Sequence, residues 1–268
     1  LQGSWTRERH VERYRLEHGA KLLESRRGHS SHEMNPFFAV LSPDATEEAG
    51  EVFGFSLIYS GSFTGALEVG SYGATRALIG LPHFDFAWQL SPGDTFQAPE
   101  AVLVHSDSGL GGMSRQYHRL YRTRLCRGPW KSKRRPVLVN NWEATYVDFN
   151  EDKLVRLADQ AKRAGIELLV MDDGWFGKRT DDHSSLGDWF VNREKLPDGL
   201  PSLVNRVRET GVGFGIWFEP EMISPDSDLY RAHPDWCVHV PGRRRTEGRT
   251  QLVLDMSRKD VCDWLIDT

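Results

Sequence analysis

Residues 168–177 read LLVMDDGWFG, and this stretch decides how the rest of the chain is organised. The run from Ile166 to Met171 is apolar and has no polar alternation, which is typical of a strand buried on both faces. Two adjacent carboxylates, Asp172 and Asp173, follow this strand directly. Because acidic side chains are costly to bury inside a sheet, we expect them where the strand ends and the sheet meets water. In α/β proteins, this carboxyl end of a strand is where functional sites are built.

Successive side chains of a strand point to opposite faces, so Asp172 and Asp173 are expected to point different ways. Such neighbours are poorly placed to flank one scissile bond as acid and nucleophile. They are better placed to accept hydrogen bonds from the hydroxyls of a polyol. The competing interpretation is that both residues start a loop and cap the next element. The chain has nine tryptophans, whose rings would suit the faces of a sugar, although a tryptophan-rich core would also use them.

The composition is that of an ordinary soluble globular protein, with 39% hydrophobic and 27% charged residues among 268. A net charge of -4 and a pI near 6.2 give no reason to expect nucleic acid or an anionic membrane as a partner. No apolar run approaches a membrane span. The three cysteines lack metal-ligand spacing, which predicts free thiols and a cytoplasmic location. The chain has no initiator methionine and stops inside an apparent helix, so we expect a piece of a longer protein.

The region 1–109 is predicted to be the end of a β-sandwich domain. Residues 53–70, FGFSLIYSGSFTGALEVG, give short alternating apolar runs separated by Ser-Gly and Thr-Gly turns. Further strands are predicted at 76–81 and 101–105, and no helical period of useful length occurs before residue 109. The region 110–135 is predicted to be a linking helix, with apolar residues at helical spacing, followed by the basic and solvated linker KSKRR.

From residue 136 to residue 268, strands and helices alternate. The segment PVLVNNWEA is predicted to be a strand, and residues 150–165 are predicted to form a helix with Asn150 as its cap and Gly165 as its stop. A second helix over 200–210 precedes the strand GVGFGIWFEPEM. Three strands that end in aromatic or acidic residues predict the rim of a (β/α)8 barrel, of which the chain would hold about the first three strands. A doubly wound sheet is the alternative, but no G-x-G-x-x-G follows the first strand.

Beyond Glu221, residues 236–240 and 251–255 are predicted to pair as a hairpin, and a last helix is predicted to begin with Ser257 as its cap. Glu219 and Glu221 are candidate catalytic carboxylates, but Pro220 between them indicates a rigid loop start. His183 follows two aspartates without the spacing of a metal site, so neither a metal nor a cofactor is expected.

Several long motifs follow one another along the chain: NNWEATY (140–146), LLVMDDGWFG (168–177), LGDWFVN (186–192), WFEPEMI (217–223) and QLVLDMS (251–257). In this order they resemble the bacterial-type α-galactosidases of glycoside hydrolase family 36. The segment 91–114 also resembles the end of that family's sandwich. The resemblance covers nearly the whole chain. It implies a retaining hydrolase of α-galactosides such as melibiose and raffinose-type oligosaccharides, and a homo-oligomer of the full-length protein.

The resemblance also implies roles for single residues. Asp172 and Asp173 match the pair that binds the O4 and O6 hydroxyls of galactose. Trp217 matches an aromatic residue of the galactose subsite, and Trp142 is expected to do the same. Arg249 matches a substrate-contacting arginine. The competing interpretations are core packing for the two tryptophans and a surface position for the arginine.

No catalytic residue of the family is matched within the chain. The family's nucleophile is the aspartate of a K-W-D-M-N-R-like motif at the end of the fourth barrel strand, and its acid/base is a later aspartate. Neither motif occurs here, so both are expected beyond Thr268. Two alternatives stay open: a non-catalytic galactoside-binding or regulatory protein of the same fold, and a galactosyltransferase resembling raffinose synthase.

Overall fold

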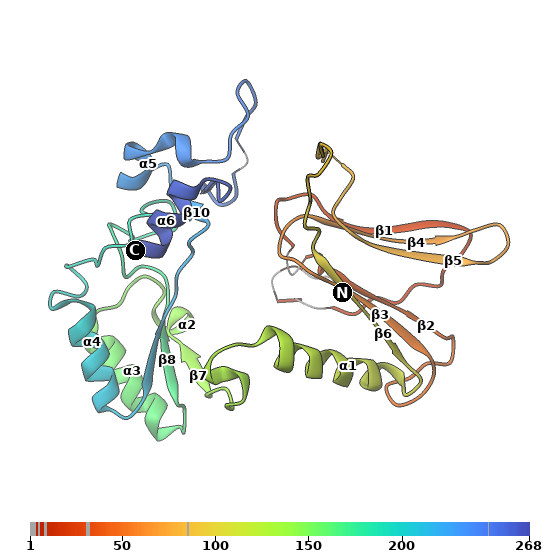
Figure 1. The fold of residues 1–268 in the computed structure, drawn as a ribbon. Helices are drawn as coiled ribbons and strands as arrows, with labels where there is room; N and C mark the ends of the chain where they lie inside the picture. The colour runs from red at the N-terminus through yellow and green to blue at the C-terminus, as the bar shows by residue number, and fades with distance from the viewer. Residues whose placement is uncertain (1–3, 5, 8–9, 31–32, 85, 246) are drawn as a thin grey trace. The chain divides into compact units, whose positions relative to one another are not determined.

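The computed structural model describes residues 4, 6–7, 10–30, 33–84, 86–245 and 247–268 (Figure 1). The chain divides into two compact units, Leu1–Lys133 and Arg134–Thr268. The finer division predicted from the sequence, with a separate linking region over 110–135, stays a prediction.

The described residues of the first unit form two antiparallel sheets of three strands each. Phe38 of one sheet lies under Gly65 of the other, where an added Cβ would come within 3.0 Å of the phenylalanine ring. Phe63 and Leu67 turn inward on the same strand as Gly65 and are buried. The predicted β-structure of this region is therefore confirmed. The sheets have the orders β1-β4-β5 and β2-β3-β6, with bounds β1 Gly19–Ser25, β2 Phe37–Leu41, β3 Val52–Ile58, β4 Phe63–Val69, β5 Thr75–Gly80 and β6 Glu100–Ser106.

Helix α1 (Gly109–Leu120) follows the last of these strands and continues as a π-helical turn, Tyr121–Leu125. Met113 and Tyr117 are buried against β3 at Gly54, where an added Cβ would come within 2.6 Å of the Met113 sulfur. The Tyr117 hydroxyl donates to the Val102 carbonyl at 3.1 Å. The helix predicted for this region is confirmed, and it packs on the sheet of β3 and β6. A 3-10 turn, Pro129–Lys131, comes next.

The second unit is built on a parallel sheet of β7 (Leu138–Asn140), β8 (Leu168–Met171) and β9 (Gly213–Ile216), in that order. Helices α3 (Glu151–Arg163) and α4 (Gly199–Glu209) connect these strands. Both helices lie on the same side of β8 (Figure 1) and contact each other. The predicted parallel order of strands is confirmed. Helices on one face of the sheet are what the first part of a (β/α)8 barrel requires. Closure into a barrel stays a prediction.

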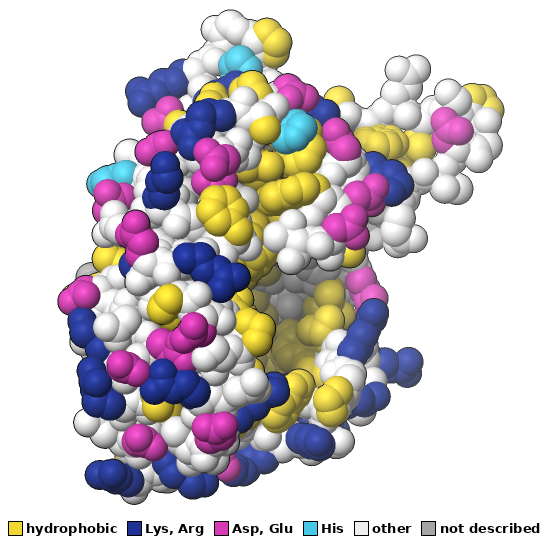
Figure 2. Space-filling view, turned by 90° about the vertical axis from the view of Figure 1, so that its left-hand side faces the viewer, with side chains coloured by type: hydrophobic (Ala, Val, Ile, Leu, Met, Phe, Trp, Pro, Cys, Tyr) yellow, Lys and Arg dark blue, Asp and Glu magenta, His cyan; other side chains and the backbone are white. Residues whose placement is uncertain are grey.

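Local sequence accounts for α3. The Asn150 side chain accepts a hydrogen bond from the Lys153 amide at 2.9 Å, and Gly165 follows the helix with a φ of +78°. Leu154 on the inner face is fully buried. On the outer face, Arg206 of α4 forms ion pairs with acidic residues at the start of α3. Figure 2 shows charges of both signs interspersed over this outer surface.

The predicted pairing of residues 236–240 with 251–255 is present in a short form. Cys237 and Leu254 form an antiparallel bridge, and the Val238 N–H donates to the Val253 carbonyl at 2.9 Å. Leu252 and Val253 also pair with residues 222–223. One prediction for this part of the chain is wrong. Ser257 does not cap the last helix, because its hydroxyl donates to Asp255 Oδ1 at 2.6 Å. The bounds here are β10 Met222–Ile223, α5 Asp228–Ala232, a 3-10 turn Pro234–Trp236, β11 Leu252–Val253 and α6 Lys259–Asp267. Among the described residues, no helix is long and apolar enough to cross a membrane.

Candidate functional site

The carboxyl ends of the three parallel strands form one rim. The amide of Asn140, the last residue of β7, donates to Asp172 Oδ2. The next side chain, Asn141, accepts a hydrogen bond from the Asp172 backbone N–H at 2.7 Å. The Trp217 backbone N–H, just beyond β9, donates to the Met171 carbonyl at 2.8 Å. Hydrogen bonds therefore connect all three strand ends around Asp172.

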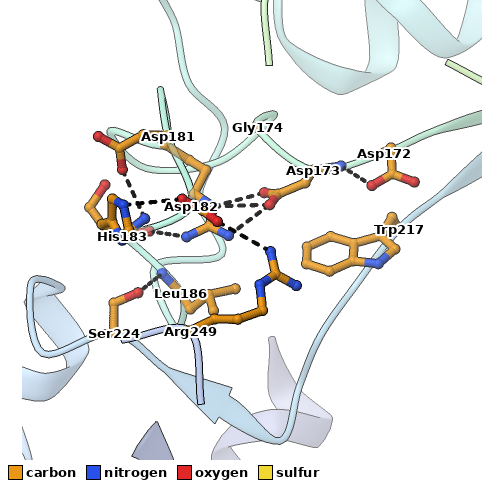
Figure 3. Close-up of polar contacts among 12 residues, drawn as sticks. Asp172, Asp173, Gly174, Asp181, Asp182, His183, Leu186, Trp217, Ser224 and Arg249 are labelled. Carbon is orange, nitrogen blue, oxygen red and sulfur yellow. Dashed lines mark hydrogen bonds and ion pairs between the residues drawn. The ribbon is translucent and has the colours of Figure 1, made fainter. Parts of the chain in front are cut away.

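Asp172 and Asp173 point different ways, as alternation along a strand predicts (Figure 3). The half-buried Asp172 carboxylate turns toward Asn140, and its other oxygen accepts from the Asp173 backbone N–H at 2.6 Å. The Asp173 carboxylate turns away from this contact and is only 4% exposed. The two acids thus differ in burial and in partners, so they are not equivalent acceptors.

Asp173 has an internal partner that sequence reasoning missed. Arg179, which is fully buried, donates from Nε to Asp173 Oδ1 at 2.9 Å and from Nη2 to Oδ2 at 2.7 Å. Both acids are predicted to accept hydrogen bonds from hydroxyls, and Asp173 also forms this buried ion pair. A buried carboxylate needs a cation, and the adjacent Lys178 and Arg179 are the near candidates. The sequence does not decide between them, because the choice depends on the path of the loop.

A second cation of the site, the half-buried Lys195, was also missed. Its Nζ donates to the carbonyls of Val147 and Gly174, each at 2.8 Å, and to the carbonyl of Arg179 at 2.9 Å. Burial lowers the pKa of Lys195, while the charges of Asp173 and another aspartate act in the opposite direction. One ammonium group therefore joins the loop before α3 to the loop that follows β8.

Arg249 lies in a turn whose backbone is left-handed, with φ of 53° at Arg249 and 60° at Thr250. Non-glycine residues rarely adopt this conformation. The Arg249 guanidinium is 3.6 Å from Asp182, toward which it points in Figure 3, and its side chain is 61% exposed. His183 Nδ1 lies 3.0 Å from the Thr250 hydroxyl. The loop after β8 thus contacts the turn that presents Arg249.

The two candidate tryptophans are both half-buried. The Trp217 ring stacks on Phe176, with centroids 6.3 Å apart, and its carbonyl accepts from the Trp175 indole at 3.0 Å. Trp142 begins the short helix α2 (Trp142–Thr145) and meets Tyr146 edge-on at 5.2 Å. Each indole packs against a neighbouring ring and keeps part of its surface exposed.

Glu219 follows Trp217 at the end of β9 and is half-buried. Burial raises the pKa of its carboxyl, and the charge of Glu221 raises it further, whereas Arg249 and Arg179 lower it. This environment makes Glu219 part of the site's electrostatics. Among the residues that the structure describes, no group of three or more His, Cys, Asp or Glu side chains is placed to hold a metal ion.

The site therefore combines a hydrogen-bonded carboxylate and a partly exposed indole on the rim with the exposed guanidinium of Arg249 on a separate turn. These groups can accept from hydroxyls, cover an apolar ring face and donate to hydroxyls, respectively. A polyhydroxylated ring is the ligand that such a set suits.

Comparison with known proteins finds relatives that match both units of the chain. The Melibiase family matches residues 95–268, and the glycosyl hydrolase family 36 N-terminal domain matches residues 1–91. Alpha-galactosidase AgaA of Geobacillus stearothermophilus is 59% identical over 268 residues, which are 100% of this chain and 37% of that relative. Alpha-galactosidase Mel36A of Lactobacillus acidophilus is 49% identical over 98% of this chain and 36% of that relative.

The fold agrees with a solved structure as well. The crystal structure of the GH36 α-galactosidase AgaA from Geobacillus stearothermophilus matches with a TM-score of 0.95 and 58% identity, over 100% of this chain and 37% of that chain. The chain thus spans a little over a third of the length of these relatives. The N-terminal-domain match covers strands β1 to β5, and the Melibiase match covers β6, α1 and the whole second unit, so the chain belongs to glycoside hydrolase family 36.

Proposed function

We propose that the chain is a segment of a longer retaining α-galactosidase, which hydrolyses terminal α-galactosides such as melibiose and raffinose-type oligosaccharides. The observation that carries this proposal is the rim around Asp172, which lies within the region that matches the Melibiase family. Structures of variants of AgaA in complex with raffinose and with stachyose support the substrate class.

Each candidate residue then has a role that its contacts allow. Asp172 accepts hydrogen bonds from galactose hydroxyls, in an orientation set by Asn140. Asp173 accepts a further hydroxyl at an oxygen that its ion pair does not saturate. Trp217 and Trp142 contribute their exposed ring surface to the galactose subsite, and Arg249 donates to the sugar from the opposite loop.

The bond-breaking groups are proposed to lie outside this chain. A retaining glycosidase needs two carboxylates about 5 Å apart, one as nucleophile and one as acid/base. Asp172 and Asp173 point different ways, and Glu219 and Glu221 are separated by a proline. Neither pair suits that geometry, so the chain supplies part of the galactose pocket without the catalytic pair.

The test is the activity of the full-length protein that carries this segment. We expect hydrolysis of p-nitrophenyl α-D-galactopyranoside and of raffinose, and none of the corresponding β-galactoside. Galactose binding without hydrolysis would instead favour the regulatory alternative. Transfer of galactose to an acceptor sugar, without release of galactose to water, would favour the transferase.

Two broader features belong to the proposal. A cytoplasmic location is supported by Cys126, Cys237 and Cys262, which are all free thiols. Fractionation of the source cells tests it. The homo-oligomeric state of the full-length protein stays a prediction, which light scattering of the purified protein checks.

A further inference from the structure

Arg179 is a fully buried cation beside Asp173. All three nitrogens of its guanidinium donate hydrogen bonds inside the protein. Nε lies 2.9 Å from Asp173 Oδ1 and 3.1 Å from Oδ2, and Nη2 donates to Oδ2 at 2.7 Å. Nη1 donates to the Ser184 carbonyl at 2.7 Å. The guanidinium therefore has an interior role and is not placed to contact substrate itself.

The loop fixes the position of this guanidinium. The Arg179 backbone N–H donates to the Phe176 carbonyl at 3.1 Å. The Arg179 carbonyl in turn accepts from Lys195 Nζ at 2.9 Å, and the same ammonium donates to the Gly174 carbonyl. Because the arginine is anchored at both its backbone and its side chain, the planar fork sets the direction of the Asp173 carboxylate.

We propose that Arg179 is a positioning residue for the reaction, and that it presents Oδ1 of Asp173 to a sugar hydroxyl. Among the residues that the structure describes, Oδ2 accepts from two guanidinium nitrogens, whereas Oδ1 accepts from Nε alone and keeps an acceptor site. This inference rests on the proposed function, because it assumes that Asp173 contacts galactose. It adds which oxygen makes the contact and which residue aims it.

Kinetics of the full-length protein separate this role from a merely structural one. Arg179→Lys keeps the positive charge and loses the two-pronged fork, so the carboxylate should tilt. A misplacement of about 1 Å can cost roughly 100-fold in rate, and we expect a fall in kcat/KM of that order for p-nitrophenyl α-D-galactopyranoside. In an Asp173→Asn background, Arg179→Lys should cause no further fall in kcat/KM. The double variant should therefore be no slower than Asp173→Asn alone.

The matched control is Arg206→Lys. Arg206 also forms two ion pairs, with Glu151 at 3.0 Å and Asp152 at 2.9 Å, but it lies between α3 and α4. We expect this variant to have the kinetics of the wild type. Losses that multiply in the Arg179→Lys and Asp173→Asn double variant would overturn the proposal, because the arginine would then act independently of Asp173.

A variant that restores the ion pair without its geometry distinguishes positioning from folding. The combination of Arg179→Lys with Asp173→Glu shortens the cation and lengthens the acid, so the pair can reform. If Arg179 positions the carboxylate, thermal stability returns toward the wild type while kcat/KM stays low. Recovery of both would show that the pair is only structural.

A crystal structure of the unaltered full-length protein with 1-deoxygalactonojirimycin, the compound bound in the structure of a variant of AgaA, keeps the proposal testable even if these variants do not fold. We expect Asp173 Oδ1 within hydrogen-bond distance of a ligand hydroxyl, with the Arg179 fork intact. Contact through Oδ2, or an Asp173 turned away from Arg179, would refute the inference. If the wild-type protein has no α-galactosidase activity, the proposed function fails. If the wild-type protein is active and the Arg179 variants have the same kinetics, only the inference about Arg179 fails.

Discussion

Lys195 joins two loops of the site through its ammonium group, and its replacement by methionine should loosen them. Methionine keeps the length of the side chain and removes all three donors. The carbonyls of Val147, Gly174 and Arg179 would then lose their partner. Gly174 and Arg179 are buried, so water does not readily replace the lost donor.

The magnitude follows from the number of groups left unpaired. A buried polar group without a partner costs about 1–3 kcal/mol. Two such carbonyls predict that the Lys195→Met variant loses roughly 2–6 kcal/mol of stability. The net loss is smaller, because the variant no longer buries an ammonium group, whose desolvation is what lowers the pKa of Lys195. A central value of about 3 kcal/mol corresponds to a change of more than 100-fold in the opening equilibrium of the loop.

Hydrogen exchange by mass spectrometry measures this opening directly. We expect faster exchange in peptides that cover residues 172–180, and unchanged exchange in α3. The matched control is Lys162→Met, because Lys162 is exposed and donates to a single carbonyl, that of Gly211 at 3.2 Å, within the described part of the chain. Its effect should stay within about 0.5 kcal/mol. Equal exchange in the two variants would refute the view that Lys195 holds the loops together.

Three further predictions concern electrostatics, a helix cap and catalysis. Burial raises the pKa of Glu219 in the folded protein above its value of 4.5 in the unfolded chain. The folded state therefore favours the protonated carboxyl, and this contribution to stability is lost as pH rises from 4.5 through the folded pKa. In urea unfolding, Glu219→Gln should therefore stabilise the protein more at neutral pH than at about pH 4, and Glu209→Gln, on the exposed end of α4, should show no such difference. Asn150→Ala removes the cap that binds the Lys153 amide and should cost about 1 kcal/mol in unfolding free energy; an unchanged value would contradict the cap. The purified 268-residue chain should not hydrolyse p-nitrophenyl α-D-galactopyranoside above background; turnover that disappears in an Asp173→Ala variant would place the catalytic groups within it.

The features predictable from the sequence are those that local pattern determines. The parallel strands follow from unbroken apolar runs, and the start of α3 follows from Asn150 and the acidic residues after it. The different directions of Asp172 and Asp173 follow from the two-residue repeat of a strand. Each of these depends on residues close together in the chain.

The features that the sequence did not predict depend on contacts between distant residues or on the path of a loop. Lys195 binds carbonyls up to 48 residues away, and no local pattern specifies such partners. Asp173 and Arg179 are only six residues apart in the chain, but it is the path of the loop that brings their side chains together. The pairing of Leu252 with Ile223 has the same origin, because the two residues lie far apart in the chain and no local pattern specifies it.

Replacing Asp172 by alanine in the full-length protein tests most directly whether this rim binds galactose. Asp172 is only half-buried, so the variant should remain folded while losing the acceptor for a sugar hydroxyl. We expect kcat/KM for p-nitrophenyl α-D-galactopyranoside to fall by roughly 100-fold or more. Asp148→Ala is the control, because its side chain is 91% exposed, and it should keep wild-type kinetics. An Asp172→Ala enzyme whose kcat/KM stays within about twofold of the wild type would contradict the assignment of this rim to the galactose subsite.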